Sequence, residues 1–505
     1  MSDPAPASSV RPDTVRRLYE RVLSAADWVH AHRKGVALAG APLLTLALVA
    51  INQFVLLDFP NSGDEYVYLY QAQTMAAGRL WNRSSLPPDV FALNYLVYDG
   101  GRVFGNFPPG WPLALALALV LHVPPWLVNP LLGSLTIGLV WALGVRLHGP
   151  RAGVMAAVFV LASPFFLFNA ASYFSHTFCG ALLLGAAWVA ARDDRSPWWV
   201  PVSVGALIGW AVLARYFTGV VCAVPIVLWF LRPGVNRPRA LGLVVLGGLP
   251  WVLVLMAYNA ELSGDPWTLT TGTQTVSLWF RNGWALRGAD ILSTHLLRHL
   301  LWTPPALLVA YLVYLRRGDK SARRGALDWM PLLMVATLYF YVERGGNQYG
   351  PRFHYEIYLF MTIFVAAHLF PPGPVTLPAT RRLLFGLSAA SLAIMPVSLV
   401  THAVIERRVI QERMDPFIRV SMTEMPPALV LIGGRVGTRR SMAALDLTRN
   451  GIDASGHVLY GIDLGEDHHC DAKSRLPGRA TYLYVWDHAR SVGLLHPLEC
   501  PAPGE

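Results

Sequence analysis

Long apolar segments separated by short polar breaks dominate the chain between residues 36 and 402. Several windows of about 20 residues carry almost no charge, and this is the length that an α-helix needs to cross a bilayer. Arginine gathers in alternate breaks, which places those breaks on the inner side of a membrane. The pattern predicts eleven spans, near residues 36–57, 126–147, 152–168, 176–191, 198–214, 217–231, 240–258, 296–315, 327–342, 355–370 and 383–402.

One further apolar run, residues 113–123, is too short to cross a bilayer. It lies between the proline-containing stretches FPPGWP and HVPPW, and we expect a re-entrant or interfacial helix on the outer side. With this topology the unusual polar stretches gather on the outer face, at residues 58–112, 169–176, 259–295, 343–354 and 403–505.

The pattern divides the chain into three parts. Residues 1–35 are polar and arginine-rich, and we expect a cytoplasmic amphipathic segment. Residues 36–402 form a transmembrane domain with a large first outer loop at 58–125. Residues 403–505 are more polar and carry the strand-like runs PALVLIGG, HVLYGIDL and ATYLYVW between turn-rich breaks. These runs predict a small extracytoplasmic α/β domain.

The composition fits a polytopic, mainly α-helical membrane protein. Of the 505 residues, 54% are hydrophobic and 14% are charged, whereas soluble globular chains carry about 25% charged residues. The formal net charge is +10, but the basic residues occupy short breaks between apolar runs, as the positive-inside rule expects. We therefore expect the lipid bilayer as a partner and no nucleic acid.

The four cysteines fall into two groups. Cys179 and Cys222 lie within apolar spans and are interpreted as packing residues. Cys470 and Cys500 lie in the outer domain, where they form either a disulfide or two free thiols. The nearby His-His-Cys run does not have the spacing of a zinc site.

The adjacent acids Asp64 and Glu65 carry the first chemical signal, because they directly follow the first span in NSGDEYVYLYQA. Acidic residues at a membrane edge are costly and usually functional. The spacing of apolar residues over 64–79 predicts an amphipathic helix lying on the membrane, with both acids at its N-terminus. Since neighbours do not share a helix face, one acid can cap the helix while the other faces a cavity.

The order of these motifs resembles a known family. The first span is followed by Asp64–Glu65 in the tyrosine-rich stretch, then by FGNFPPGWP, an apolar hairpin around LGVRLHGPRAGVMAAVFVLASPFFLF, and GGNQYGPRFHYE. Over roughly residues 35–370 this is similar to the bacterial relatives of the dolichyl-phosphate-mannose protein mannosyltransferases. Those proteins belong to the GT-C membrane glycosyltransferases.

The resemblance implies an inverting transfer of a monosaccharide from a polyprenyl-phosphate donor to a hydroxyl acceptor, on the outer face of a bacterial inner membrane. It makes Asp64 the general base, with Glu65 beside it. The donor phosphate needs cationic partners, and Arg guanidinium matches phosphate oxygens well. The candidates for this site are Arg352 and Arg215, with His354 and Tyr349 as helpers and His176 in support.

These assignments have simpler alternatives. Either arginine could be an interfacial anchor, and His176 an ordinary interfacial histidine. Some relatives bind a divalent metal through acids in the second outer loop, but residues 169–176 contain none. We therefore expect no cofactor and do not favour a divalent cation. A transporter or flippase for a lipid-linked glycan is the alternative function; it predicts charged or polar residues buried in the middle of spans and broken helices at the midplane.

Overall fold

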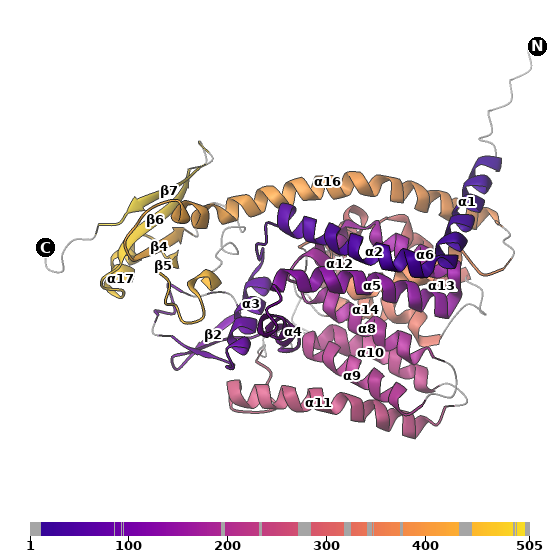
Figure 1. Ribbon diagram of the computed structural model, residues 1–505, viewed down its shortest axis with the longest axis horizontal. Coiled ribbons are helices and arrows are strands. Elements are labelled where there is room, and N and C mark those ends of the chain that lie inside the picture. Colours follow the sequence, from indigo (N-terminus) through magenta and orange to yellow (C-terminus); the bar gives the residue numbers. More distant parts are fainter. Residues whose placement is uncertain are drawn as a thin grey trace, which may run out of the picture.

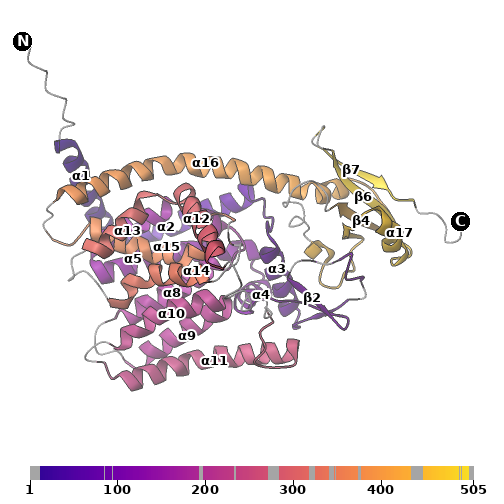
Figure 2. The ribbon, with the colours of Figure 1, turned by 180° about the vertical axis from the view of Figure 1, so that it is seen from behind.

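The computed structural model describes residues 12–499 apart from 85, 92, 94, 193–196, 232–234, 271–283, 318–324, 341–345, 347, 374–376, 434–446, 488, 489 and 491. A helical body fills one end of the molecule, and a C-terminal sheet lies at the other (Figure 1). The longest helix joins the two along one side, which Figure 2 shows from behind.

The helical body is built from sixteen α-helices in this part of the chain. Proline stands at the first turn of α5, α6 and α7, where its missing N–H costs no hydrogen bond. The helices are α1 (Pro12–Ala31), α2 (Arg33–Ala50), α3 (Gly63–Ala76), α4 (Gly110–Val120), α5 (Pro125–His148), α6 (Pro150–Leu161), α7 (Pro164–Ala171), α8 (His176–Ala190), α9 (Trp199–Ala214), α10 (Tyr216–Leu228), α11 (Arg237–Ser263), α12 (Trp284–Trp302), α13 (Ala306–Arg317), α14 (Met330–Phe340), α15 (Tyr355–Leu369) and α16 (Ala379–Ser421).

The protein is a polytopic helical membrane protein, but the expected eleven spans are not confirmed. Four described helices are long and apolar enough to cross a bilayer, or six if two bent pairs each count as one span. The predicted span 152–168 bends by 70° between α6 and α7, and 296–315 bends by 114° between α12 and α13. Pro164 and Pro304 stand at these two breaks. Proline has no backbone N–H to continue the helical hydrogen-bond ladder, and this explains why each helix is interrupted there.

The N-terminal helix α1 is amphipathic, as its sequence predicts. Tyr19, Leu23 and Ala26 are buried at helical spacing, and the Tyr19 hydroxyl donates to the Leu369 carbonyl at 2.6 Å. The apolar run near 113–123 forms the separate eleven-residue helix α4, followed by a short turn into α5.

The helix α16 runs for 43 residues, well beyond the predicted end of the last span at 402. Its second half, from Ala403 onward, is polar yet unbroken, because its Glu, Arg and Gln residues favour helix. Arg407 on this half donates to the Phe54 carbonyl at 2.7 Å. The helix therefore extends from the apolar body to the C-terminal sheet (Figure 1).

The three predicted strand runs at the C-terminus are confirmed, and a fourth strand joins them. The sheet has the order β5–β4–β6–β7, with β4 parallel to β5 and β6, and β7 antiparallel to β6. The helix α17 (Glu466–Ser474) provides the crossover between parallel strands. The strands are β4 (Ala428–Gly433), β5 (Val458–Asp463), β6 (Ala480–Asp487) and β7 (Val492–Pro497).

The first outer loop folds as a unit around α3. A small antiparallel sheet of β1 (Asn82–Arg83), β3 (Arg102–Gly105) and β2 (Leu96–Asp99) lies beside this helix. The expectation that α3 lies on the membrane surface is wrong. Its residues from Glu65 to Thr74 are mostly buried on all sides, because α4, β3 and neighbouring loops enclose the helix.

The first outer loop and the C-terminal sheet share one hydrophobic core. Val90 and Phe91 of the loop pack with Leu429 and Leu459 of the sheet. The edge strand β5 is closed by the loop, because the Ile462 N–H donates to the Val90 carbonyl at 2.7 Å. The two parts are thus joined by main-chain pairing as well as by apolar contact.

Candidate active site

The N-terminus of α3 carries a capping arrangement that separates the roles of the two adjacent acids. Ser62 is the N-cap residue, and its hydroxyl accepts from the Glu65 N–H at 3.4 Å. Glu65 reaches back and accepts from the Asn61 N–H at 2.9 Å. This S-x-x-E pattern is visible in the sequence as Ser62–Glu65, and it makes Glu65 the capping residue of the pair.

Glu65 also joins two outer loops. Its second carboxylate oxygen accepts from the Tyr173 N–H at 2.9 Å, in the loop between α7 and α8. The side chain is buried, and burial raises the pKa of Glu65 to about 7, although the two backbone N–H donors act in the opposite direction. Glu65 is therefore placed to hold the loops together rather than to meet a substrate.

Asp64, by contrast, keeps a partly exposed carboxylate and contacts Arg352, one of the two candidate phosphate ligands. Arg352 Nη1 donates to Asp64 Oδ2 at 3.0 Å, with the Asp64 side chain 21% exposed and the Arg352 side chain 9% exposed. The Arg352 guanidinium also lies 3.9 Å from the ring centroid of Phe174, a cation–π contact. The structure thus brings together two residues that are far apart in the sequence.

The backbone before Arg352 is held in one conformation by Gly350. This glycine has φ of +99°, and a Cβ there would stand 2.6 Å from a ring carbon of Phe165. The Arg352 N–H then donates to the Gly346 carbonyl at 2.8 Å. A larger residue would strain this turn, so the guanidinium is presented from a rigid support.

A second buried cluster surrounds Arg215, which lies between α9 and α10. Arg215 Nη1 donates to the Ser175 hydroxyl at 3.1 Å, and its Nε lies 3.3 Å from Glu356 Oε1. His176 Nδ1 lies 3.3 Å from the same oxygen. Glu356 is fully buried on the second residue of α15, so it orients the arginine and the histidine together.

The two clusters adjoin at Tyr68. Its hydroxyl lies 3.3 Å from the Ser175 hydroxyl. The charges of Asp64, Arg215 and Arg352 all act on this phenol, although burial is the main reason that its pKa is raised to about 12. Tyr68 therefore lies where the carboxylate and both arginines converge, and it stays protonated as a hydrogen-bond donor at neutral pH.

The two predicted helper residues, Tyr349 and His354, lie in different surroundings. Tyr349 is buried, its hydroxyl accepts from Asn61 Nδ2 at 3.3 Å, and its carbonyl accepts from Asn169 at 3.0 Å. It supports the loop beneath Asp64. His354 turns to a histidine cluster, with its Nδ1 2.8 Å from His299 Nε2. The structure does not bring His354 to the acid–arginine pair.

Several site residues were not expected from the sequence. Glu356 is one, and Asp58 is another, since its carboxylate accepts from the Tyr173 hydroxyl. Leu57 and Asp58 both have positive φ, of 55° and 51°, a strained conformation for leucine. Arg413 of α16 donates to the Asn61 carbonyl at 2.5 Å. The sequence holds no spacing signal for these contacts, which link segments far apart in the chain.

The described residues do not assemble a recognisable metal centre. No group of three or more His, Cys, Asp or Glu side chains in this part of the chain has the geometry to hold an ion. Asp64 and Glu65 face different partners, and the loop between α7 and α8 adds no carboxylate. These residues do not fit the metal site of some relatives, and no step below uses one.

The cysteine pairing predicted for the outer domain stays a prediction. Cys179 and Cys222 are free and buried, in agreement with a packing role. Cys470 is disulfide-bonded, and Cys500 lies outside the described residues.

Comparisons with known proteins bear on the fold. No family model and no curated protein matches the chain. ArnT from Cupriavidus metallidurans bound to undecaprenyl phosphate aligns with a TM-score of 0.56 at 12% identity, over 91% of this chain and 93% of that one. The apo state of the same protein aligns with a TM-score of 0.54 at 13% identity, again over 91% of this chain and 93% of that one.

A third solved structure, the apo oligosaccharyltransferase of Archaeoglobus fulgidus, gives a TM-score of 0.47 at 12% identity, over 89% of this chain and 69% of that one. The fold assignment rests on the two ArnT structures, which match nearly the whole of both chains. The chain therefore has the fold of the two ArnT structures, in a polytopic helical membrane protein.

Proposed function

We propose that this protein transfers a monosaccharide from a polyprenyl-phosphate donor to a hydroxyl acceptor, with inversion, on the periplasmic face of a bacterial inner membrane. The observation that carries the proposal is the placement of one partly exposed carboxylate, Asp64, against Arg352, with Arg215 close by through Tyr68. Asp64 thus provides a base, and Arg352 and Arg215 provide two cations near it, all at the ends of helices. The undecaprenyl phosphate bound to ArnT supports the donor class.

The chemistry follows from these groups. Asp64 takes the proton of the acceptor hydroxyl as the oxygen attacks the anomeric carbon. The bond between that carbon and the phosphate oxygen breaks on the opposite face, so the configuration inverts. The leaving polyprenyl phosphate gains one negative charge. Arg352 and Arg215 are positioned to stabilise that charge, which is greatest as the bond breaks.

The buried cluster around Glu356 supports Arg215 in this scheme. A cationic side chain is costly to bury alone, and the Glu356 carboxylate 3.3 Å away offsets that cost. His176 lies against the same carboxylate. We assign both residues to positioning the guanidinium rather than to contact with substrate.

The transporter alternative is less well supported. Transport predicts ionisable groups in the middle of membrane spans and broken helices at the midplane. The two bent helix pairs agree with the second expectation, but the ionisable cluster around Glu356 does not agree with the first. Here His176 begins α8, Arg215 separates α9 from α10, and Glu356 is the second residue of α15. The ionisable cluster therefore lies at helix ends, beside Asp64 and the first outer loop, as an interfacial reaction requires.

The test is turnover by the purified full-length protein in nanodiscs, with a panel of undecaprenyl-phosphate hexoses and pentoses. Release of undecaprenyl phosphate is measured for the wild type, for Asp64→Asn, and for Asp99→Asn as a matched control on an exposed acid of the same loop. We expect activity in the wild type and the control and a loss in Asp64→Asn. Full activity in a folded Asp64→Asn protein would exclude Asp64 as the base.

A further inference from the structure

Two cavities meet at the junction of the first outer loop and the C-terminal part. The larger one, here called the outer groove, has a volume of about 900 Å³ and is lined by Arg79, Trp81, Leu113, Val254, Glu261 and others. The smaller one, the junction pocket, has about 120 Å³ and is lined by residues that include Tyr70, Tyr98 and Asn450. Arg83 and Asp453 line both cavities.

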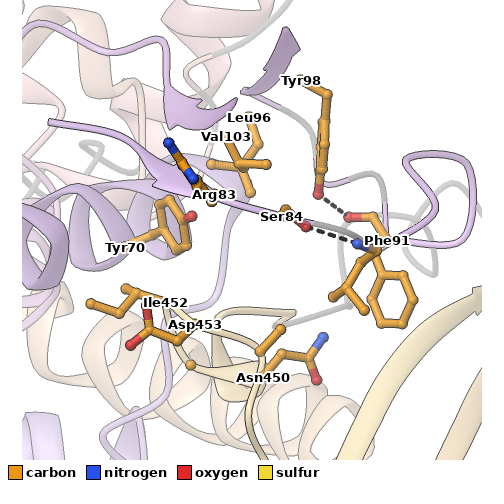
Figure 3. A pocket seen from close by; sticks show the side chains of 13 residues that line it. Tyr70, Arg83, Ser84, Phe91, Leu96, Tyr98, Val103, Asn450, Ile452 and Asp453 are labelled. Atoms are coloured by element: carbon orange, nitrogen blue, oxygen red, sulfur yellow. Dashed lines mark hydrogen bonds between the residues drawn. The ribbon is translucent and has the colours of Figure 1, made fainter. Parts of the chain in front are cut away.

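The junction pocket is built by two separate segments. Figure 3 shows Arg83 and Tyr98 of the first outer loop across the pocket from Asn450 and Asp453. Its lining offers the Arg83 guanidinium and the Asp453 carboxylate to the hydroxyls of a ligand. The Asn450 amide is instead paired with the main chain of Tyr460, and the Tyr98 hydroxyl donates to the Phe91 carbonyl. A ligand in this pocket must therefore contact both the first outer loop and the C-terminal part.

The outer groove combines an aromatic wall with polar groups. Trp81 is held in place because its indole N–H donates to Glu261 Oε1 at 3.0 Å. A flat indole offers an apolar face to the C–H face of a sugar ring. Arg79 and Asp453 form a 3.2 Å ion pair with both side chains largely exposed. Such a pair contributes little stability, so a polar ligand can replace it at small cost.

The other side of the groove is apolar and continues onto the lipid-facing surface. Leu113 on α4 is 37% exposed and Val254 on α11 is 39% exposed. Further outward-facing residues of α11, such as Val245 and Leu253, are more than half exposed, as expected of a helix in contact with lipid. The outer groove therefore has apolar side chains on the side next to the lipid and charged and aromatic side chains on the other side. Its occupant must be amphiphilic.

The groove lies at the opposite end of α3 from the base. Asp64 is in the first turn of this helix, and Met75, near its end, lines the groove. Eleven residues of α-helix span about 16 Å. An acceptor seated in the groove reaches Asp64 with a hydroxyl only if its polar part is extended over several sugar units.

We propose that the outer groove and the junction pocket form the binding site for the acceptor, and that the acceptor is a membrane-anchored glycan with an extended head group. Its acyl chains contact Leu113 and Val254, and its sugars contact Trp81, Arg83 and Asp453. This inference rests on the proposed glycosyl transfer and narrows its acceptor to a glycolipid.

The experiment measures binding apart from transfer. Wild-type protein in nanodiscs of phosphatidylethanolamine and phosphatidylglycerol is titrated with a fluorescent dodecyl maltotrioside as the probe. Trp81→Ala and Arg83→Ala test the site, and Arg83 is exposed in the two-residue strand β1, so its removal leaves the core intact. Trp267→Ala is the matched control, because Trp267 is 76% exposed and does not line either cavity.

We expect each site variant to weaken probe binding at least about tenfold and Trp267→Ala to leave it unchanged. Tail-less maltotriose should compete at least about tenfold less well than the probe. Unchanged binding in Arg83→Ala or equal competition by maltotriose would each overturn the inference. Undecaprenyl phosphate binding and donor consumption, measured on the same variants, report separately on the proposed transfer reaction.

Discussion

Arg352 Nη1 donates a hydrogen bond to Asp64 Oδ2 at 3.0 Å, so the proposed base and the proposed phosphate ligand neutralise each other. A donor phosphate that binds Arg352 competes with the Asp64 carboxylate for the same guanidinium. Donor binding therefore releases the base at the moment when it is needed. This contact suggests that the donor binds before the acceptor hydroxyl is deprotonated.

The first prediction is that Asp64→Ala has opposite effects on binding and turnover. Transfer should fall at least about a hundredfold, the usual loss when a general base is removed. Undecaprenyl phosphate should bind more tightly, because the Asp64 carboxylate no longer competes for Arg352. Binding is measured by titration and turnover by phosphate-lipid release. Weaker binding in the variant would contradict the competition.

The second prediction concerns the buried pair of Arg215 and Glu356. Glu356→Ala should destabilise the protein by about 3–5 kcal/mol, because it leaves a buried cation without its partner. The double variant Arg215→Met with Glu356→Met should recover most of this stability and stay inactive. The thermal midpoint in detergent and donor consumption check both results.

The control for this pair is Glu412→Ala, which breaks a surface pair with Arg408 whose side chains are 81% and 52% exposed. Its thermal midpoint should barely change, since exposed pairs contribute at most about 1 kcal/mol. An active double variant would show that Arg215 is needed only for folding.

The third prediction is that the stability of the folded protein depends on pH through the titration of Glu65. Burial raises the pKa of Glu65 from its ordinary 4.5 to about 7. Between these values the folded protein holds a proton that the unfolded chain has released, so stability falls as pH rises through this window and levels off above it. The full effect is at most about 3 kcal/mol.

The Glu65→Gln variant should lack the part of the pH-dependent loss of stability that Glu65 causes. The thermal midpoint is measured between about pH 5 and pH 8, where the wild type is expected to lose more stability than the variant. Glu412→Gln, at an exposed position, should keep the wild-type slope. If Glu65→Gln follows the wild-type curve throughout, Glu65 does not titrate in this range.

The fourth prediction is that transfer does not require a divalent cation. The described site offers two arginines for the phosphate, and its other carboxylates, Asp58, Glu65 and Glu356, each face protein groups rather than gathering around Asp64. Donor consumption should therefore be equal with excess EDTA and with added Mg²⁺ or Mn²⁺. Loss of activity in EDTA that Mg²⁺ restores would show that the reaction uses a metal.

The sequence predicted those features that depend on local patterns. The C-terminal strands follow from alternating apolar runs, and the helix after Asp64 follows from its spacing. The role of Asp64 as base came from the family resemblance, and Arg352 was chosen as a phosphate ligand from its position on the outer side. Their direct contact was not predicted. The capping role of Glu65 has a local signal, because Ser62 stands three residues earlier.

Other features depend on tertiary contacts that no local pattern records. Glu356 looks like an isolated acid at the start of an apolar helix until Arg215 and His176 are placed beside it. The burial of α3 arises from α4 and β3, which fold over its outer side. The break in the span 296–315 did have a local signal, because Pro304 and Pro305 are adjacent, but hydropathy averages over such breaks.

The core shared by the first outer loop and the C-terminal sheet constrains how the protein is made. Asp89 and Arg475, which pair across this contact, are 386 residues apart in the chain. At about 5–20 residues per second, the ribosome needs roughly 20–80 s to synthesise the intervening chain. The loop that holds Asp64 must wait that long after its own synthesis before its partner arrives. A prematurely terminated chain would insert into the membrane yet lack the contacts that complete its active-site loop.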